Sequence, residues 1–290
     1  MTAHLAMEGP VLLCYDGSDH AARAIRSAAT LLRARPAVVV HVLQRPPKEG
    51  LAESGRRLAI DAGFGPVRAV EAGFGDVATV ILREARDQGA AVIVAGPHRR
   101  SPAPPAPLGS VSSALVARSG VPVLVARPGP SPTAAAGPVF ACYDGSPIAR
   151  EAIVTAAGLL AGPAAIVATF MPAVDDGAVL RSTLPWPVAA EVQDRLAQLD
   201  REEAEAPFER AAEGARAAAD AGFVSRPVGI RGANASSEEE DPWMRLLRVA
   251  ASEEAACIVV GHRPSVKALG STAHGLVDHA DRSVLVAPGR

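Results

Sequence analysis

Two stretches of this chain are nearly the same, and they constrain the fold more than any other feature. VLLCYDGSDHAARAIRSAATLL begins at Val11, and VFACYDGSPIAREAIVTAAGLL begins at Val139. Thirteen of the 22 aligned residues are identical, including all of CYDGS. A composition rich in Ala does not produce shared Cys, Tyr and Asp, so the chain contains an internal repeat. Its 290 residues are enough for two domains of ordinary size.

Short apolar segments alternate with segments of helical period in both halves. They are near-continuously apolar, as strands of a parallel sheet covered on both faces should be. The expected strands are residues 11–15, 37–43, 66–72, 90–95 and 121–126, then 139–143, 164–170, 226–230, 255–261 and 283–287. This order predicts an α/β protein made of two doubly wound, five-stranded parallel-sheet domains.

The domain boundaries follow from composition. We expect domain 1 at residues 1–128 and domain 2 at residues 139–290, joined by a linker at 129–138 that is rich in Pro and Gly. Domain 2 is longer because of a helical insertion at about 171–222, where Pro207 should kink or end a helix.

Charge and composition exclude several classes of protein. A net charge of −2 with balanced acidic and basic residues gives no basis for binding nucleic acid. No apolar run approaches the length of a membrane span, and the first residues do not resemble a signal peptide. Three Cys residues without a CxxC spacing favour a reducing, cytoplasmic location, and no cluster has metal-ligand spacing.

Asp16 and Asp144 stand directly after the first strand of each half, in the sequence YDGS. In doubly wound sheets this loop borders the crevice where ligands bind. Each carboxylate could accept hydrogen bonds from a ribose or base, or it could only order its own turn. Ser18 and Ser146 are placed to cap the following helices. Both interpretations of the two Asp residues stay open at this point.

A second pattern follows the fourth strand of each half. Gly96 and Gly261 end these strands, and Gly109–Ser110 and Gly270–Ser271 begin the next helices. A helix N-terminus presents free N–H groups to an anion, although a Gly-Ser pair alone most often only starts a helix.

Taken together, these residues resemble the universal stress protein family. The likeness rests on DGS after the first strand, Gly at the end of the fourth, and GSVSSALVARSGVPVLVAR, and it covers both halves apart from the linker and the insertion. It implies dimerisation through the last strands and, in one branch of the family, ATP binding through a G-x2-G-x9-G-S/T loop. In tandem members the halves can mimic the dimer, so we expect an intramolecular pseudo-dimer in which residues 121–126 face 283–287. A further homodimer stays open, and so do protein partners.

The first half keeps the spacing of that loop: two residues separate Gly96 from position 99, and nine more separate position 99 from Gly109 and Ser110. Arg99 replaces the second Gly, and four Pro residues in the loop have no N–H to donate. Arg99 and Arg100 could instead hold phosphates with their side chains. The resemblance adds Val42, at the adenine-packing position, and Val111, next to Ser110.

The second half departs further from the family pattern. Only five residues separate Pro264 from Gly270, and Phe170 takes the place of the adenine-packing Val. We therefore expect ATP or ADP in the first half and a degenerate site, formed by Asp144, Gly261, Gly270 and Ser271, in the second.

Three functions are compatible with this sequence. The first is a nucleotide-responsive or protein-interaction module of the stress response. The second is a slow ATPase or phosphotransferase, which is disfavoured because no general base or Mg²⁺-binding carboxylate pair accompanies the loop. The third is a structural pseudo-dimer that binds partner proteins and no nucleotide. No residue is predicted to be catalytic.

Overall fold

The computed structural model describes residues 8–46, 49–97, 108–129, 136–172, 205–232, 241–263 and 269–289. The elements of the first half are β1 (Val11–Cys14), α2 (Asp19–Leu31), β2 (Ala37–Val42), α3 (Leu51–Asp61), β3 (Val67–Ala72), α4 (Val77–Asp87), β4 (Val92–Ala95), α5 (Ser110–Arg118) and β5 (Val123–Val125). Those of the second half are β6 (Val139–Cys142), α6 (Pro147–Leu159), β7 (Ala164–Met171), β8 (Val224–Arg231), α9 (Pro242–Ser252), β9 (Cys257–His262), α10 (Ser271–His279) and β10 (Ser283–Pro288). Residues 205–220 are also helical.

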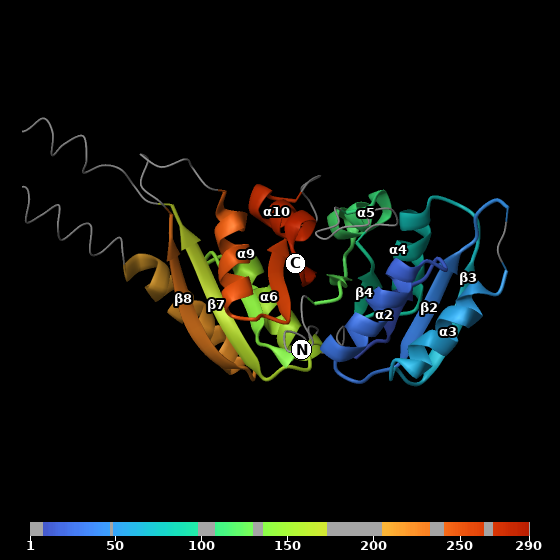
Figure 1. Cartoon of the computed structure of the whole chain (residues 1–290), viewed down its shortest axis with the longest axis horizontal. Coiled ribbons are helices and arrows are strands. Elements are labelled where there is room, and N and C mark those ends of the chain that lie inside the picture. Colours follow the sequence, from blue (N-terminus) through green and yellow to red (C-terminus); the bar gives the residue numbers. More distant parts are fainter. Residues whose placement is uncertain are drawn as a thin grey trace, which may run out of the picture.

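The strands form one continuous sheet of ten (Figure 1), in the order β3-β2-β1-β4-β5-β10-β9-β6-β7-β8. Within each half all the neighbouring strands are parallel, which confirms the two predicted five-stranded parallel sheets. β5 and β10 join the halves as an antiparallel pair. The order of the second half is therefore the mirror image of the first, as a pseudo-twofold axis between the two requires.

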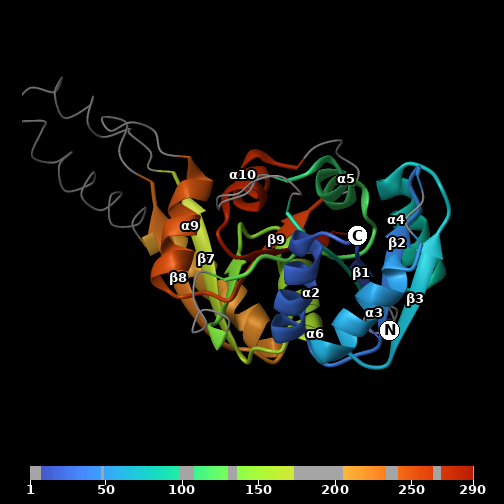
Figure 2. The ribbon, with the colours of Figure 1, turned by 45° about the vertical axis from the view of Figure 1, so that its right-hand side comes forward.

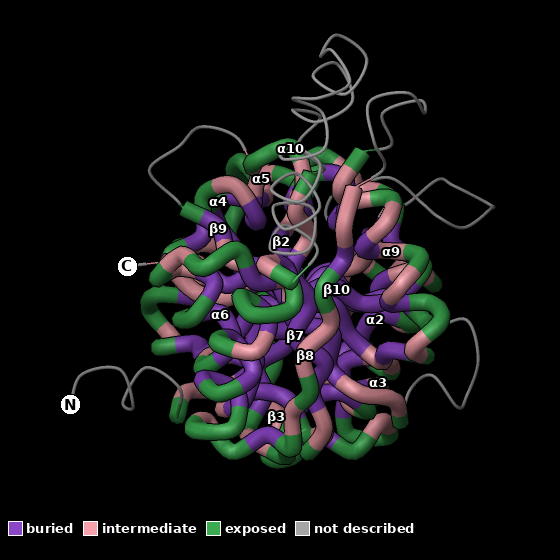
Figure 3. Tube along the Cα trace, turned by 90° about the vertical axis from the view of Figure 1, so that its left-hand side faces the viewer, coloured by how far each residue is buried: buried purple, intermediate pink, exposed green. Residues whose placement is uncertain are grey.

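Helices cover both faces of the sheet, and each face has its own apolar core. Alternate strand residues point to opposite faces, so Leu13 belongs to one core and Leu12 to the other. The first core includes Ile25 of α2 and Ile153 of α6, whereas the second includes Leu115 of α5. Each core runs through both halves of the chain. Figure 3 shows the buried residues gathered in the strands, with exposed residues on the outside.

The last strands pair as predicted. Leu124 of β5 lies opposite Leu285 of β10, with Val125 opposite Val284 and Val123 opposite Val286. Leu124 and Leu285 are fully buried. Because each last strand covers the open edge of the other, neither edge is left to pair with a foreign strand.

A second junction between the halves involves the repeated Leu-Leu that ends the matching stretches. The Arg33 N–H donates to the carbonyl of Leu159 at 2.9 Å, and the Ala161 N–H donates to the carbonyl of Leu31 at 2.8 Å. These bonds join the ends of α2 and α6, which lie near each other in Figure 2. The two bonds are related by the same pseudo-twofold axis as β5 and β10, so the repeated ending of both copies lies at this junction.

Several local predictions from the sequence are confirmed. The Ser18 hydroxyl accepts from Ala21 N–H at 3.2 Å and caps α2, and Ser146 caps α6 through Ala149 N–H at 3.1 Å. Pro207 lies in the first described turn of the helix at residues 205–220, and the preceding residues, whose helix it was expected to kink or end, lie outside the described residues. The other helical residues expected within the insertion lie outside the described residues.

Candidate functional site

The strand order reverses between β1 and β4, and this is where the predicted site residues gather. β2 lies beside β1, on the side away from β4. Asp16, Val42 and Gly96 stand at the carboxyl ends of these three strands, and α5 starts at the end of the loop that follows β4. In open α/β sheets this crevice is the usual place for a ligand.

The turn after β1 has the same geometry as the turn after β6. A carboxylate oxygen of Asp16 accepts from Ser18 N–H at 2.9 Å, and Asp144 accepts from Ser146 N–H at 2.9 Å. Gly17 and Gly145 have φ of 81° and 87°, in the left-handed region that favours Gly. Each Asp therefore orders its own turn. The turns differ in exposure, because Asp16 is half-buried and Asp144 is exposed.

A side chain of the second strand fixes each of these turns, which the sequence reasoning missed. His41 Nδ1 lies 3.0 Å from the carbonyl oxygen of Tyr15, and the Thr169 hydroxyl donates to the carbonyl of Tyr143 at 2.8 Å. A carbonyl only accepts, so Nδ1 of His41 carries the proton. Both side chains are buried. The same sequence offset between partners in both halves is the signal that could have revealed them.

A close Gly–Tyr contact places the helix that covers each turn. A Cβ added at Gly55 of α3 would lie 2.7 Å from the Tyr15 ring, and one at Gly214 would lie 2.7 Å from the Tyr143 ring. Residues 205–220 therefore occupy in the second half the place that α3 has in the first. The residues in excess lie between β7 and this helix.

The side chain that contacts the Gly of each turn, Gly17 or Gly145, differs between the halves. In the first half a Cβ at Gly17 would lie 3.0 Å from the Leu51 side chain. In the second half the corresponding neighbour of Gly145 is Arg210, which donates to the carbonyl of Asp144 at 3.4 Å. An apolar side chain thus covers the first turn and a cation the second.

The ends of the loop after β4 are held together. Gly109 N–H donates to the carbonyl of Pro97 at 2.6 Å, and the buried Ser112 hydroxyl donates to the carbonyl of Gly96 at 2.6 Å. Gly109 is the N-cap of α5, and as a Gly it has no side chain to cap the helix. Ser110 is exposed at the first position of the helix, and Val111, which follows it, is half-buried. Arg99 and Arg100 lie outside the described residues.

The corresponding loop of the second half has no Ser in the place of Ser112. Ala273 stands in α10 where Ser112 stands in α5, so no hydroxyl reaches the carbonyl of Gly261 from that position. A Cβ at Gly261 would lie 2.7 Å from the Ile148 side chain, so helix packing accounts for this Gly. Gly270 is the N-cap of α10, and Ser271 is its exposed first residue.

The two adenine-packing positions also differ. Val42, at the end of β2, is buried at 6% exposure, whereas Phe170 in β7 is half-buried. Val42 belongs to the core beneath α4 and α5. A small, buried aliphatic side chain therefore stands at the end of the second strand in the first half, and a larger, half-buried aromatic ring stands in the second.

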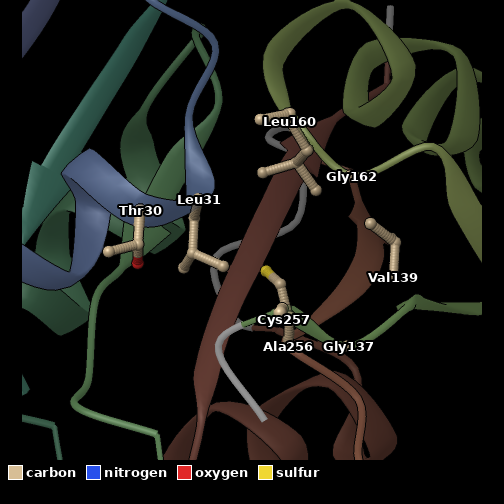
Figure 4. A pocket seen from close by; sticks show the side chains of 10 residues that line it. Thr30, Leu31, Gly137, Val139, Leu160, Gly162, Ala256 and Cys257 are labelled. Atoms are coloured by element: carbon tan, nitrogen blue, oxygen red, sulfur yellow. The ribbon is translucent and has the colours of Figure 1, made fainter. Parts of the chain in front are cut away.

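A small cleft lies far from this crevice, at the amino ends of the strands (Figure 4). It has a volume of about 180 Å³ and is bounded by the end of α2 and by the starts of β6 and β9. Its lining is apolar side chains and backbone except for Thr30 and Cys257, and burial raises the pKa of the Cys257 thiol to about 12. A protonated thiol is a weak nucleophile, so the cleft offers little chemistry.

Two further expectations concern metals and membranes. Within the described ranges, no group of three or more His, Cys, Asp or Glu side chains could hold a metal ion. Among those same residues, no helix is both long and apolar enough to cross a bilayer.

The structure is similar to solved structures along its whole length. One is a universal stress protein from Archaeoglobus fulgidus DSM 4304, with a TM-score of 0.61, 17% identity, and coverage of 97% of this chain and 98% of that one. Another is a functionally unknown protein from Pseudomonas aeruginosa PAO1, with a TM-score of 0.57, 15% identity, and coverage of 98% and 94%. At these identities the likeness shows the fold alone. No curated protein matches the chain.

The sequence itself matches a family model in each half. The model of the universal stress protein family matches residues 7–127 and again residues 137–288. The two matches together cover nearly all of the chain, and each spans one five-stranded half of the sheet. The chain therefore belongs to the universal stress protein family, as a tandem member with two copies of the domain.

Proposed function

We propose that the first half binds ATP or ADP and that the second half is mainly its structural partner. The observation that supports this best is the pair of hydrogen bonds that hold the two ends of the loop after β4 together, which we call the base of the loop. Gly109 N–H donates to the carbonyl of Pro97, and the Ser112 hydroxyl donates to the carbonyl of Gly96. This base follows β4, and Asp16 follows β1, the strand that pairs with β4. The second half keeps Asp144 but has Ala273 in place of Ser112 and a shorter loop.

In this proposal each site residue has a separate task. Val42 packs against the adenine, and Asp16 accepts hydrogen bonds from the ribose. The N–H groups of Ser110 and Val111, at the positive end of the α5 dipole, face the phosphates. Arg99 and Arg100 supply the donors that the loop prolines lack.

Binding without committed turnover follows from the same residues. Phosphoryl transfer requires a base or water-positioning group and ligands for Mg²⁺. The residues assigned above contact the adenine, the ribose and the phosphates. We assign none of them as a base, as a water-positioning group or as a ligand for Mg²⁺. We therefore propose a nucleotide-responsive module of the cytoplasmic stress response, whose state is read by partner proteins.

A structural pseudo-dimer without nucleotide is the second candidate. It is favoured by the continuous ten-stranded sheet, which needs no ligand, and by Arg99 in place of the motif Gly. In that case the loop after β4 is a surface for partners.

One experiment separates these functions. Equilibrium dialysis with radiolabelled ATP measures binding, and analysis of the same sample for ADP and phosphate measures turnover. We expect one equivalent of ATP or ADP bound per chain and no turnover above the blank. Multiple turnovers would establish the enzyme, and absence of binding in every variant described below would establish the structural pseudo-dimer.

A further inference from the structure

A carboxylate of the second half reaches the start of α5 in the first half. The Leu108 N–H, directly before the N-cap Gly109, donates to Asp278 Oδ1 at 3.4 Å. Asp278 belongs to α10, which lies beside α5 in Figures 1 and 2. This bond therefore links the end of the loop after β4 to the other domain.

Two basic side chains lie near this carboxylate or its helix. His274, one turn earlier in α10, places Nε2 at 3.2 Å from Asp278 Oδ2. The buried Arg127 of the first half donates to the carbonyl of Val277 at 2.9 Å. Burial lowers the pKa of Arg127 to about 10, and the charges of Asp278 and Asp281 oppose that shift. Asp278 is thus one member of a charged cluster at the junction of the halves.

Packing within the second half holds α10 in place. The ring of His279 stacks on that of Trp243 from α9, with centroids 4.4 Å apart and an interplanar angle of 15°. The buried Arg282, just after α10, donates to the carbonyls of Ala250 and Ala255 at 2.9 Å each. Because α10 is fixed against α9, a rigid element holds Asp278 beside the start of α5. A displacement of Asp278 would therefore change the position of α10 relative to α5 and α9.

The contact has no equivalent on the other side of the pseudo-twofold axis. Counted from the first Ser of each helix, Asp278 of α10 corresponds to Ala117 of α5. Ala117 has no side-chain oxygen to offer to Leu269, the residue that corresponds to Leu108. Among the residues that the structure describes, the helix start that we assign to phosphate therefore receives a carboxylate from the opposite half, and its counterpart at α10 receives none from the equivalent position.

We propose that Asp278 acts as an autoinhibitory anion for the first half. Its carboxylate lies against Leu108, directly before the N-cap of α5, and its charge weakens the binding of phosphate at that helix start, so that occupancy of the first half is coupled to α10 in the second. This inference rests on the proposed function. Because coupling between sites is reciprocal, ATP must in turn weaken the contact between Asp278 and Leu108.

The test is titration calorimetry of the full chain with ATP, ADP and adenosine, comparing the wild type with Asp278→Asn. The Asn side chain has the same shape and can still accept from Leu108, so the variant removes the charge alone. We expect ATP to bind about three- to tenfold more tightly to the variant, the size of one screened charge interaction at short range. Adenosine affinity should not change, because adenosine has no phosphate.

The matched control is Asp281→Asn. It makes the same change in net charge next to the same Arg127, but Asp281 is paired with Arg282 at 2.7 Å in the second half. An equal gain in this control, or unchanged or weaker ATP binding in Asp278→Asn, overturns the inference and leaves the proposed function intact. If Asp278→Asn binds ATP and the wild type does not, the result supports autoinhibition. If neither the wild type nor Asp278→Asn binds ATP, both the proposed function and this inference are overturned.

Discussion

Leu124 of β5 and Leu285 of β10 face each other directly across the antiparallel pair that joins the two halves. Both are fully buried and belong to the same core cluster, which contains residues of both halves. The boundary between the domains in the sequence is therefore not a boundary in the core. The two halves should unfold as one unit.

Leu124→Ala and Leu285→Ala should each lower the free energy of unfolding by about 2–5 kcal/mol, because each leaves a cavity at the junction. Since the residues lie opposite each other, the effects of the double variant should not add. Urea denaturation followed by circular dichroism measures this. Ile60→Ala, at a site 45% exposed, is the control. A second, separate unfolding transition in the wild type would contradict the shared core.

Gly55→Ala and Gly214→Ala should both destabilise the protein. In a helix this change normally adds about 1 kcal/mol of stability. Here the new methyl group would lie 2.7 Å from the Tyr15 or Tyr143 ring, and overpacking of this kind costs about 1–3 kcal/mol. Gly120→Ala, where a Cβ meets nothing within 4 Å, is the control in the same urea assay. Higher stability of both helix variants would show that the rings move aside without cost.

Asp16→Ala should weaken ATP binding at least about tenfold, the effect of losing a hydrogen bond to a charged group. Asp144→Ala is a matched control, because both substitutions remove the same bond within the turn, at 2.9 Å in each half. Fluorescence titration with a labelled ATP analogue compares them. Equal losses at the two positions would mean that the halves do not differ as proposed.

The double variant Arg99→Ala with Arg100→Ala should lose affinity for ATP and keep its affinity for adenosine. Arg side chains bind phosphate oxygens through paired donors, and adenosine offers no such partner. Parallel titrations with both ligands give the ratio of the two losses. The same fractional loss for ATP and adenosine would show that these side chains do not contact phosphate.

The three thiols should react slowly with Ellman's reagent at pH 8 and rapidly in urea. Burial raises the pKa of Cys14, Cys142 and Cys257 from 9.0 to about 12, and Asp16 and Asp144 add to the first two shifts. Cys257 is fully buried and should react last. Between pH 9 and 12 the folded thiols keep protons that the unfolded thiols release, so the free energy of unfolding should fall as pH rises through this window. Fast labelling of the native protein, or constant stability up to pH 11, would contradict this.

The sequence predicted those parts of the fold that depend on local patterns. The repeated YDGS stretch predicted the capping by Ser18 and Ser146, because an N-cap bond spans only three residues. β8 was harder to delimit, since Pro227 lies within it and proline is tolerated there only because β8 is the last strand of the sheet.

The arrangement of the candidate site was predictable to a smaller extent. Asp16, Val42 and Gly96 could be placed because each ends a strand, and strand ends meet at one edge of a parallel sheet. Leu51, Arg210 and Asp278 could not be placed, because they reach the two crevices from helices whose position depends on packing across the sheet. No local pattern in the sequence encodes that packing.

The single copy of Asp278 shows what fusion of two domains allows. In a homodimer every substitution appears twice, so a carboxylate added at one helix start is added at its twin as well. In this chain the twin position is Ala117, and the two crevices can differ in charge although they share one sheet. Gene fusion thus allows an unequal pair of sites, in which one half can regulate while the other responds.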